Sequence, residues 1–411
     1  MNALEILSVI FATAAIFGLI STRWLRLPAT VGTMLLTVLV SAGLTLGAGV
    51  APQIHHWASD LVRQINFESI VMHGMLPLLL FAGAFLLDLE QLAREKLAVS
   101  LFAIAGTTLS FVLVAALMAL LSGGNIPWMQ CLIFGALISP TDPIAVLEML
   151  RRAGIPGRIQ AQLAGESLFN DGLGAVIFIT MLEVARGHAP TPWHVAGFLV
   201  VEAGGGILLG IAAAWVTSRL MRICDAFQVD ILFTITLALG GYFVANLLHL
   251  SAPLEAVVAG IALRHLNCRL PAERIAHESV DRFWELIDEI QNSVLFVLLG
   301  LEAMAISLDA PTLRAGLTAI LSMNAVRFAI VAFLLAVIRL LRPSHRSSIF
   351  VLTWGGLRGG LSIALALSVP EALGRSWMLG ATYMVVFFSI VFQGGSMDLL
   401  LRKQRAKALV T

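Results

Sequence analysis

The chain has 411 residues, of which 59% are hydrophobic and only 12% are charged, and its mean hydropathy is +0.92. Soluble domains carry about a quarter charged residues, so this composition excludes a soluble protein and predicts an all-α polytopic membrane protein. The formal net charge of +1 offers no basic surface for nucleic acid, because the charged residues are sorted by position along the chain.

Apolar windows long enough to cross a bilayer recur along the whole chain. We expect about thirteen transmembrane helices, of which the ninth is the shortest. The first window has no basic residue before it, so it predicts a permanent span and not a cleaved signal peptide. The thirteen windows are 3–21, 28–49, 67–87, 97–121, 129–150, 159–184, 195–218, 230–249, 252–265, 283–305, 313–338, 347–370 and 377–400.

Lys and Arg residues are distributed unevenly between the two sides that these spans define. The loops after odd-numbered spans, together with the C-terminal segment, hold 20 of them, and the loops after even-numbered spans hold four. Basic residues concentrate on the cytoplasmic side of membrane proteins. The pattern therefore predicts an N-terminus outside the cell and a cytoplasmic C-terminus.

The window 159–184 carries four polar residues near its middle, Glu166, Ser167, Asn170 and Asp171. A charged side chain at the bilayer centre costs at least ~2.5–3.5 kcal/mol on insertion scales, so a buried acid usually faces a partner or a water-filled cavity. The spacing i,i+4 of Glu166 with Asn170, and of Ser167 with Asp171, places all four on one helix face. This face predicts an oxygen-rich site for a cation or a proton.

The window 129–150 contains the sequence SPTDP, in which Pro140 and Pro143 each remove a backbone donor. We expect the helix to break there, with Thr141 and Asp142 at the break. A simple proline kink is the alternative. The aspartate between the prolines favours a break, because broken helices at mid-membrane line cavities and coordinate ions in transporters.

A second interruption is expected in the window 347–370, where glycines surround Arg358. Glycine allows a helix to unwind, although close packing of helices through small residues is the alternative. The two interrupted windows are spans 5 and 12, an odd offset, so they cross the membrane in opposite directions. This arrangement predicts an inverted repeat of spans 4–6 and 11–13, with the two broken helices crossing near the midplane.

A further arginine, Arg327, lies near the middle of the window 313–338. An unpaired guanidinium would be costly there, so we expect a structural ion pair with Glu166. The alternative is that the long side chain reaches the membrane interface.

Four stretches together resemble the monovalent cation:proton antiporter-1 family of NhaP-like sodium/proton exchangers, namely SPTDP (139–143), GESLFND (165–171), MNAVRF (323–328) and WGGLRGG (354–360). The resemblance implies a homodimer that works by alternating access in the plasma membrane, which in a bacterium is the inner membrane. It also implies a dimerisation domain of residues 1–90 and 195–305, a core transport domain of residues 97–184 and 313–402, and a short cytoplasmic tail, 403–411.

The resemblance also implies roles for single residues. Asp171 corresponds to the carboxylate that binds the ion and the proton, and Asn170 before it marks electroneutral members. Glu166 corresponds to the acid that pairs with Arg327. Three more positions correspond to the ion site, where Na⁺ would bind with Asp171: Thr141 through its main-chain carbonyl, Asp142 and Ser167. The positions that correspond to support of the broken helices are Arg358, Pro140 and Pro143. Gly360 and Glu255 depart from the family pattern.

Na⁺ is a hard cation that oxygen ligands satisfy, and a buried carboxylate can bind H⁺ in its place. We therefore expect a secondary active transporter, and not an enzyme, that exchanges Na⁺ or Li⁺ for H⁺ without net charge movement and without a cofactor. Two alternatives remain open. The cation could be K⁺, because the sequence does not give the cavity size, or the chain could be a gated cation channel, because broken helices and acids also serve channels.

Overall fold

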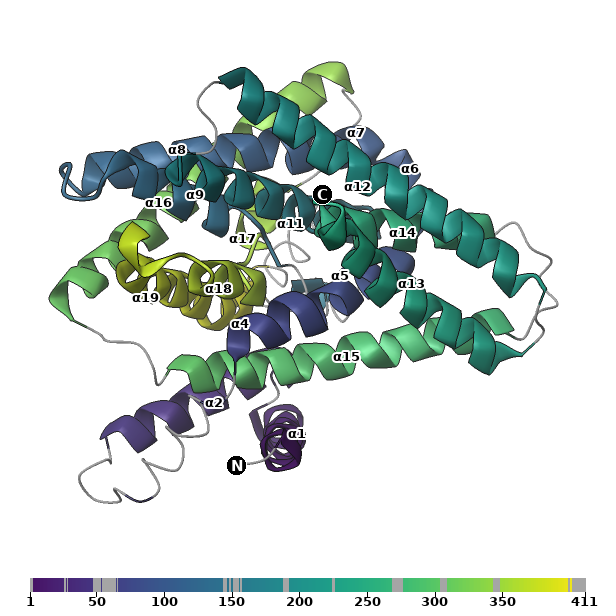
Figure 1. The fold of residues 1–411 in the computed structure, drawn as a ribbon. Helices are drawn as coiled ribbons and strands as arrows, with labels where there is room; N and C mark the ends of the chain where they lie inside the picture. Colours follow the sequence, from purple (N-terminus) through teal and green to yellow (C-terminus); the bar gives the residue numbers. More distant parts are fainter. Residues whose placement is uncertain are drawn as a thin grey trace, which may run out of the picture.

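The computed structural model describes residues 3–25, 29–46, 66–142, 157–187, 192–223, 226–267, 276–303, 309–342 and 348–397, with a few isolated positions between these ranges. Within this part of the chain the secondary structure is helical and includes no strand (Figure 1). The helices of the first half are α1 (Ala3–Ile20), η1 (Ser21–Leu25), α2 (Ala29–Leu46), α4 (Phe67–Ser69), η3 (Ile70–Met75), α5 (Leu76–Phe85), α6 (Leu89–Arg94), α7 (Lys96–Ser100), η4 (Leu101–Gly106), α8 (Thr107–Leu121), α9 (Trp128–Ile138) and α11 (Gly157–Ala185). Those of the second half are α12 (Pro192–Met221), α13 (Phe227–Leu247), α14 (Ala252–Asn267), α15 (Ala276–Glu302), α16 (Ala310–Leu341), α17 (Ile349–Trp354), α18 (Gly360–Leu367), η6 (Glu371–Leu373), α19 (Arg375–Phe387) and η7 (Phe388–Gly394).

Every window predicted from the sequence coincides with at least one helix. Eight continuous helical runs in the described residues are long and apolar enough to cross a membrane by length and composition. The other windows do not hold such a run. Their helices are shorter in α2, α9 and α14, and more charged in α15. One window is divided between α17 and α18. The all-α polytopic class is confirmed, whereas the number of thirteen spans stays a prediction.

Local sequence signals explain where several helices begin. Asp309 precedes α16 and accepts a hydrogen bond from the Thr312 main-chain N–H at 3.0 Å, with a proline in the first helical turn. A carboxylate at this position satisfies a backbone donor that the helix leaves free. The side-chain and main-chain hydrogen bonds from Thr312 hold the pKa of the Asp309 carboxyl below its usual range. Ser348 caps α17 in the same way through the N–H of Val351.

The helices pack as two bundles that meet at α11. The first bundle contains α8, α9, α16, α18 and α19, and the second contains α1, α2, α5, α12, α13, α14 and α15. In Figure 1 the first bundle lies to the left and the second to the right and below, with α15 running along the lower side of the molecule. Helix α11 contacts α9 of the first bundle and α14 of the second, so its middle lies at the junction.

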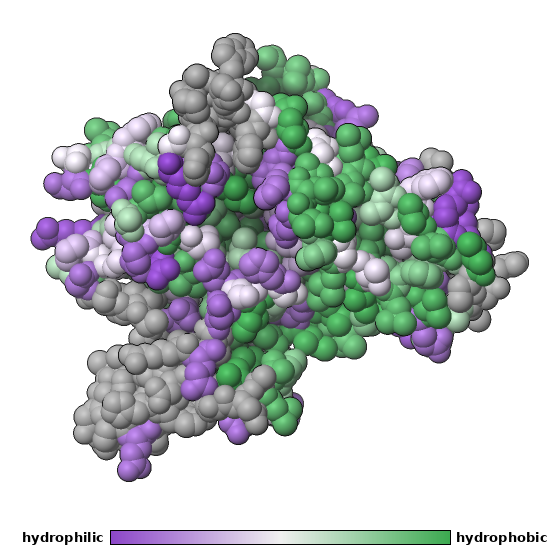
Figure 2. Space-filling view, viewed as in Figure 1, coloured by the Kyte–Doolittle hydropathy of each residue, from purple (hydrophilic) through white to green (hydrophobic). Residues whose placement is uncertain are grey.

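Large apolar side chains remain exposed along the outside of many helices. Figure 2 shows them as a broad hydrophobic area on the face drawn. A soluble monomer rarely exposes so large an apolar surface, whereas a protein in a bilayer presents it to lipid. Among the most exposed are Leu4, Leu120, Leu208, Leu232, Phe243, Leu321, Phe333 and Leu340.

Candidate ion-binding site

Two helices of the first bundle are interrupted at the same place. Helix α9 ends at Ile138, and the chain from Pro140 to Asp142 is not helical. The other interruption separates α17 from α18, across residues 355–359. The main-chain N–H of Asp142 donates a hydrogen bond to the carbonyl of Leu357 at 2.9 Å, so the two breaks contact each other directly. The predicted crossing of two broken helices is confirmed, while Pro143 lies outside the described residues.

Helix α11 holds the first break through Asn170. Its amide oxygen accepts a hydrogen bond from the Thr141 N–H at 3.0 Å, and its amide nitrogen donates to the Thr141 hydroxyl at 2.7 Å. One turn earlier, the Ser167 hydroxyl donates to the main-chain carbonyl of Thr141. Because both polar ends of its amide are engaged and it is 2% exposed, Asn170 positions the break and does not face open space.

Glu166, on the same helix, is paired with Arg327 of α16. The guanidinium donates to both carboxylate oxygens, and it also donates to the Leu352 carbonyl at 2.9 Å. Both side chains are almost fully buried, with exposed fractions of 3% for Glu166 and 8% for Arg327. This geometry is bidentate, the strongest form of the arginine–carboxylate interaction.

The second break leaves room for this guanidinium because residue 356 is glycine. A Cβ atom built on Gly356 would lie 2.6 Å from Nε and 2.8 Å from Cζ of Arg327. Gly359 has the same relation to Asp142, whose Cγ would lie 2.7 Å from a Cβ atom at residue 359. Side chains at these two positions would displace the charged groups that the break accommodates.

Arg358 lies inside the second break and is 1% exposed. Its guanidinium donates to the main-chain carbonyls of Gly356 at 3.0 Å and Leu357 at 3.4 Å. Carbonyls that lose their helical donors at mid-membrane need such partners. Arg358 therefore satisfies the broken backbone from which it projects.

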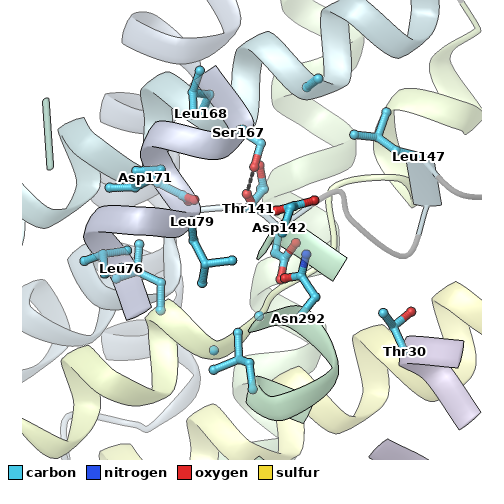
Figure 3. Close-up of a pocket in the computed structure, with 18 of the residues that line it drawn as sticks. Thr30, Leu76, Leu79, Thr141, Asp142, Leu147, Ser167, Leu168, Asp171 and Asn292 are labelled. Atoms are coloured by element: carbon cyan, nitrogen blue, oxygen red, sulfur yellow. Dashed lines mark hydrogen bonds between the residues drawn. The ribbon is translucent and has the colours of Figure 1, made fainter. Parts of the chain in front are cut away.

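A cavity of about 680 Å³ opens beside the two breaks. Thr141, Asp142, Ser167 and Asp171 line one side of it, together with residues 359–362 at the start of α18. Leucines of α5 and residues in the middle of α15 also line it. Figure 3 shows the Asp171 carboxylate directed toward the contact between Ser167 and Thr141.

Thr141, Asp142, Ser167 and Asp171 thus bring two carboxylates, two hydroxyl groups and a main-chain carbonyl to the cavity wall. Asp142 and Arg358 are the charged residues that act on Asp171 electrostatically. In the described part of the chain no cluster of three or more His, Cys, Asp or Glu side chains could hold a metal ion. Oxygen ligands of mixed charge suit a hard monovalent cation, and the carboxylates can also take a proton.

The residues predicted for the site fall into two groups. Asp171, Asp142, Thr141 and Ser167 line the cavity, whereas Glu166 and Asn170 lie behind its wall with their polar groups bound to Arg327 and Thr141. Glu255 of α14 does not line the cavity. It is fully buried beside α13, and within the described ranges neither of its carboxylate oxygens has a hydrogen-bond partner.

The sequence interpretation missed the polar side of α15. Glu285, Asp288, Glu289 and Asn292 all line the cavity, and none of them was assigned to the site from the sequence. Their spacing of three and four residues was visible in the sequence. It indicates one helix face, but it cannot say which other helix that face meets.

Known proteins are similar to this chain over most of its length. The family model described as "Sodium/hydrogen exchanger, transmembrane" matches residues 11–403. The Na⁺/H⁺ antiporter NhaP of Pseudomonas aeruginosa is 37% identical over 97% of this chain and 96% of its own length. The Na⁺/H⁺ antiporter NhaH of Halobacillus dabanensis is 30% identical over 89% and 90%, respectively.

A solved structure shares the fold. The sodium proton antiporter of Methanocaldococcus jannaschii, determined at pH 8, superposes with a TM-score of 0.73 over 98% of this chain and 99% of that chain, at 19% identity. The family model covers nearly the whole sequence, and the bacterial relatives align along nearly their full lengths. The chain therefore belongs to the transmembrane sodium/hydrogen exchanger family.

Proposed function

We propose that the protein exchanges Na⁺ for H⁺ across a membrane, with Asp171 as the carboxylate that binds either ion. The family is one of transporters, and two of its members that resemble this chain over most of its length are named Na⁺/H⁺ antiporters. The observation that carries the proposal is the position of Asp171. It lines a cavity with Asp142, Ser167 and Thr141, at the point where two broken helices touch.

The exchange follows from competition at one carboxylate. The Asp171 carboxylate, the Asp142 carboxylate, the Ser167 hydroxyl and the Thr141 carbonyl offer Na⁺ four oxygen ligands of the kind that hard cations prefer. A proton on Asp171 removes the negative charge that holds the cation. If the empty charged site does not cross between the two sides of the membrane, each Na⁺ carried one way is exchanged for H⁺ carried the other way.

One proton for one cation is the stoichiometry that this geometry favours. Glu166 is held at both carboxylate oxygens by Arg327, and it does not line the cavity where the cation would bind. Asn170, adjacent to Asp171, is a neutral amide bound to Thr141. Asp142 is proposed to keep one protonation state and to hold the break. The exchange would then be electroneutral and would need no cofactor, since ion gradients supply the driving force.

Alternating access needs two bodies that move relative to each other. We assign the core transport domain to residues 97–184 and 313–402 and the dimerisation domain to residues 1–90 and 195–305, a division supported by the two packed bundles. The assembly would be a homodimer in the plasma membrane, the inner membrane in a bacterium. With the C-terminus in the cytoplasm, the end of the cavity nearest Glu285 of α15 would face the cytoplasm.

The alternatives are less well supported. K⁺ as the preferred cation is not favoured, because the related proteins are named for Na⁺. A gated channel would need a continuous water-filled path. The direct contact of the two breaks, through the hydrogen bond from Asp142 to Leu357, is more suited to a carrier.

Purified protein in liposomes tests this function. An inside-acidic pH gradient should drive saturable Na⁺ uptake with simultaneous proton release, and Li⁺ should compete, whereas K⁺ should not. Protein-free liposomes are the control. Unsaturable Na⁺ flux that continues without any proton movement would identify a channel and would contradict the proposal.

A further inference from the structure

A carboxyl group that the proposed exchange does not use is buried in the second bundle. Glu255 lies in the first turn of α14, a helix that packs against α5, α11, α12 and α13 (Figure 1). The residue is 0% exposed, and within the described ranges neither of its carboxyl oxygens has a hydrogen-bond partner. Buried polar groups nearly always have a partner, so this one requires an explanation.

Glycines on the neighbouring helices leave the space that Glu255 occupies. A Cβ atom at Gly241 of α13 would lie 2.8 Å from Cδ and 3.0 Å from Oε2 of Glu255. A Cβ atom at Gly210 of α12 would lie 2.7 Å from the main-chain carbonyl oxygen of the same residue. The carboxyl group is therefore enclosed by close contacts between α14 and two other helices, without room for a bound ion.

Within the part of the chain that the structure describes, no positively charged side chain pairs with Glu255 or acts on it electrostatically. The helices around it carry acids or a phenol where they contact the first turn of α14. These titratable residues are Glu202 of α12, Tyr242 of α13 and Asp171 of α11. Tyr242 donates its hydroxyl to the Met72 carbonyl at 3.1 Å, and α5 has no titratable side chain.

The start of α14 does not compensate a charge on Glu255 either. A helix N-terminus favours negative charge, chiefly through its free N–H groups. Here Ser251 takes those nearest to Glu255, because its hydroxyl accepts the N–H of Leu254 at 3.3 Å and its carbonyl accepts that of Glu255 at 2.9 Å. An ionised carboxyl group in this place would be an uncompensated buried charge, whereas the neutral acid avoids that cost.

We infer that Glu255 is a proton-binding site, separate from the exchange site, and that its proton holds the first turn of α14 against α13 and α11. The contact with α11 is made by Leu254, whose Cδ2 would lie 2.7 Å from a Cβ atom at Gly172. Because Gly172 follows Asp171, this turn of α14 borders the ion site. Loss of the proton would place a charge between α13 and α14 and would loosen the turn.

Unfolding at different pH values tests the site without transport. Reversible unfolding of the purified wild type and of Glu255→Gln is compared in Na⁺-free mixed micelles, from mildly acidic to alkaline pH. A proton held by the folded protein and released by the unfolded chain stabilises the fold at low pH, and this contribution is lost as pH rises. In that range the wild-type unfolding constant should rise by up to about tenfold per pH unit relative to the variant. Asp171 and the other acids titrate in both proteins, so their contributions cancel.

Infrared spectroscopy detects the bound proton directly, because a carboxylic acid and a carboxylate absorb at different frequencies. At neutral pH the wild type should show a carboxylic-acid band that is missing from Glu255→Gln and is kept in Asp171→Asn. Glu202→Gln is the matched control, since Glu202 is a buried acid of the same bundle. This variant should keep both the band and the pH dependence of the wild type.

The position of the carboxyl group is tested by a double-mutant cycle. Gly241→Ala should destabilise the wild type, because the added methyl group would meet the Glu255 side chain. The same substitution should cost less in Glu255→Ala, where that side chain is shortened. If Glu255→Gln is not recovered folded, Glu255→Met, which is unbranched and has no proton to lose, takes its place.

The site is overturned if wild type and Glu255→Gln show parallel pH dependence, if the carboxylic-acid band persists in Glu255→Gln, or if Glu202→Gln removes the pH dependence instead. None of these measurements requires exchange activity. Failure of proton-coupled flux in wild-type liposomes would instead contradict the proposed function and leave the proton site at Glu255 standing.

Discussion

Two carboxylates on α11, Glu166 and Asp171, lie five residues apart and have opposite surroundings. Glu166 is 2% exposed and is bound at both oxygens by Arg327. Asp171 lines a cavity of about 680 Å³ together with a second carboxylate, Asp142. The same residue class on the same helix is thus a satisfied structural group in one place and an open ligand in the other.

The comparison shows that depth in the membrane does not by itself identify an ion site. Both acids lie in an apolar helix, and burial disfavours the charge of each. The difference is the partner. The guanidinium of Arg327 binds both oxygens of Glu166 and fixes the position of that side chain. Asp171 instead lines the cavity beside hydroxyl and carbonyl oxygens, where a cation or water can bind. Experiments that remove the partner or crowd it should therefore affect the two acids differently.

The largest effect on stability is expected from breaking the Glu166 pair. Glu166→Ala or Arg327→Ala each leaves a buried, uncompensated charge, which costs about 3–5 kcal/mol by soluble-protein precedent. Arg327→Ala should be the more damaging, because it also leaves the Leu352 carbonyl without its donor. The double variant should lose less than the sum of the two single losses. Thermal unfolding in detergent measures all three.

An exposed ion pair within one helix provides the control. Glu278 and Arg282 of α15 form an i,i+4 pair with side chains that are 70% and 75% exposed. Such pairs contribute roughly 0.3–0.5 kcal/mol, so their removal should scarcely change the melting temperature. Strictly additive losses for Glu166 and Arg327 would show that the two residues do not interact in the membrane.

A smaller effect is expected from crowding the guanidinium. In Gly356→Ala the new methyl group would lie within 3 Å of three Arg327 atoms that Glu166 and Leu352 hold in place. Overpacking of this kind typically costs about 1–3 kcal/mol. Gly43→Ala, in α2 where a Cβ atom meets nothing within 4 Å, should be neutral or slightly stabilising. Equal melting temperatures for both variants would mean that the guanidinium is not fixed as described.

No effect at all is expected from a membrane potential. With Glu166 bound and Asn170 neutral, one cation exchanges for one proton and no net charge moves. A valinomycin-clamped potential of 100 mV is worth about 2.3 kcal/mol per net charge, so an electrogenic carrier would respond clearly. In wild-type proteoliposomes without a pH gradient, Na⁺ should not accumulate. Accumulation would indicate that Asp142 or Glu166 also releases protons.

Much of the fold could be predicted because its signals are local or are forced by the membrane. Apolar windows mark the helices, and Pro140 removes a donor at a fixed point, which predicts the end of α9. The contact between Glu166 and Arg327 was expected because a buried guanidinium requires a carboxylate and few are available at its depth. In these cases the free-energy cost of an unpaired buried charge or an interrupted hydrogen-bond ladder was large enough to leave one structural solution.

The remaining features depend on three-dimensional proximity that no local pattern gives. Asn170 seemed to face the ion because its spacing places it beside Asp171, but Thr141 lies close enough to bind both ends of its amide. The ligands of Arg358 are carbonyls of its own break, which side-chain patterns do not reveal. Similarly, α15 enters the site by tertiary packing, so Asn292 could not be distinguished from an ordinary contact between helices.

The central claim, that Asp171 is the exchanging carboxylate, is tested most directly by Na⁺-driven proton movement in proteoliposomes that contain Asp171→Asn. The substitution keeps the shape of the side chain and removes its charge and its proton. We expect no Na⁺-dependent proton movement from this variant, although it remains folded. Glu183→Gln, on the same helix but outside the cavity, should behave as the wild type. Na⁺-dependent proton movement that persists in the Asp171→Asn vesicles would contradict the account.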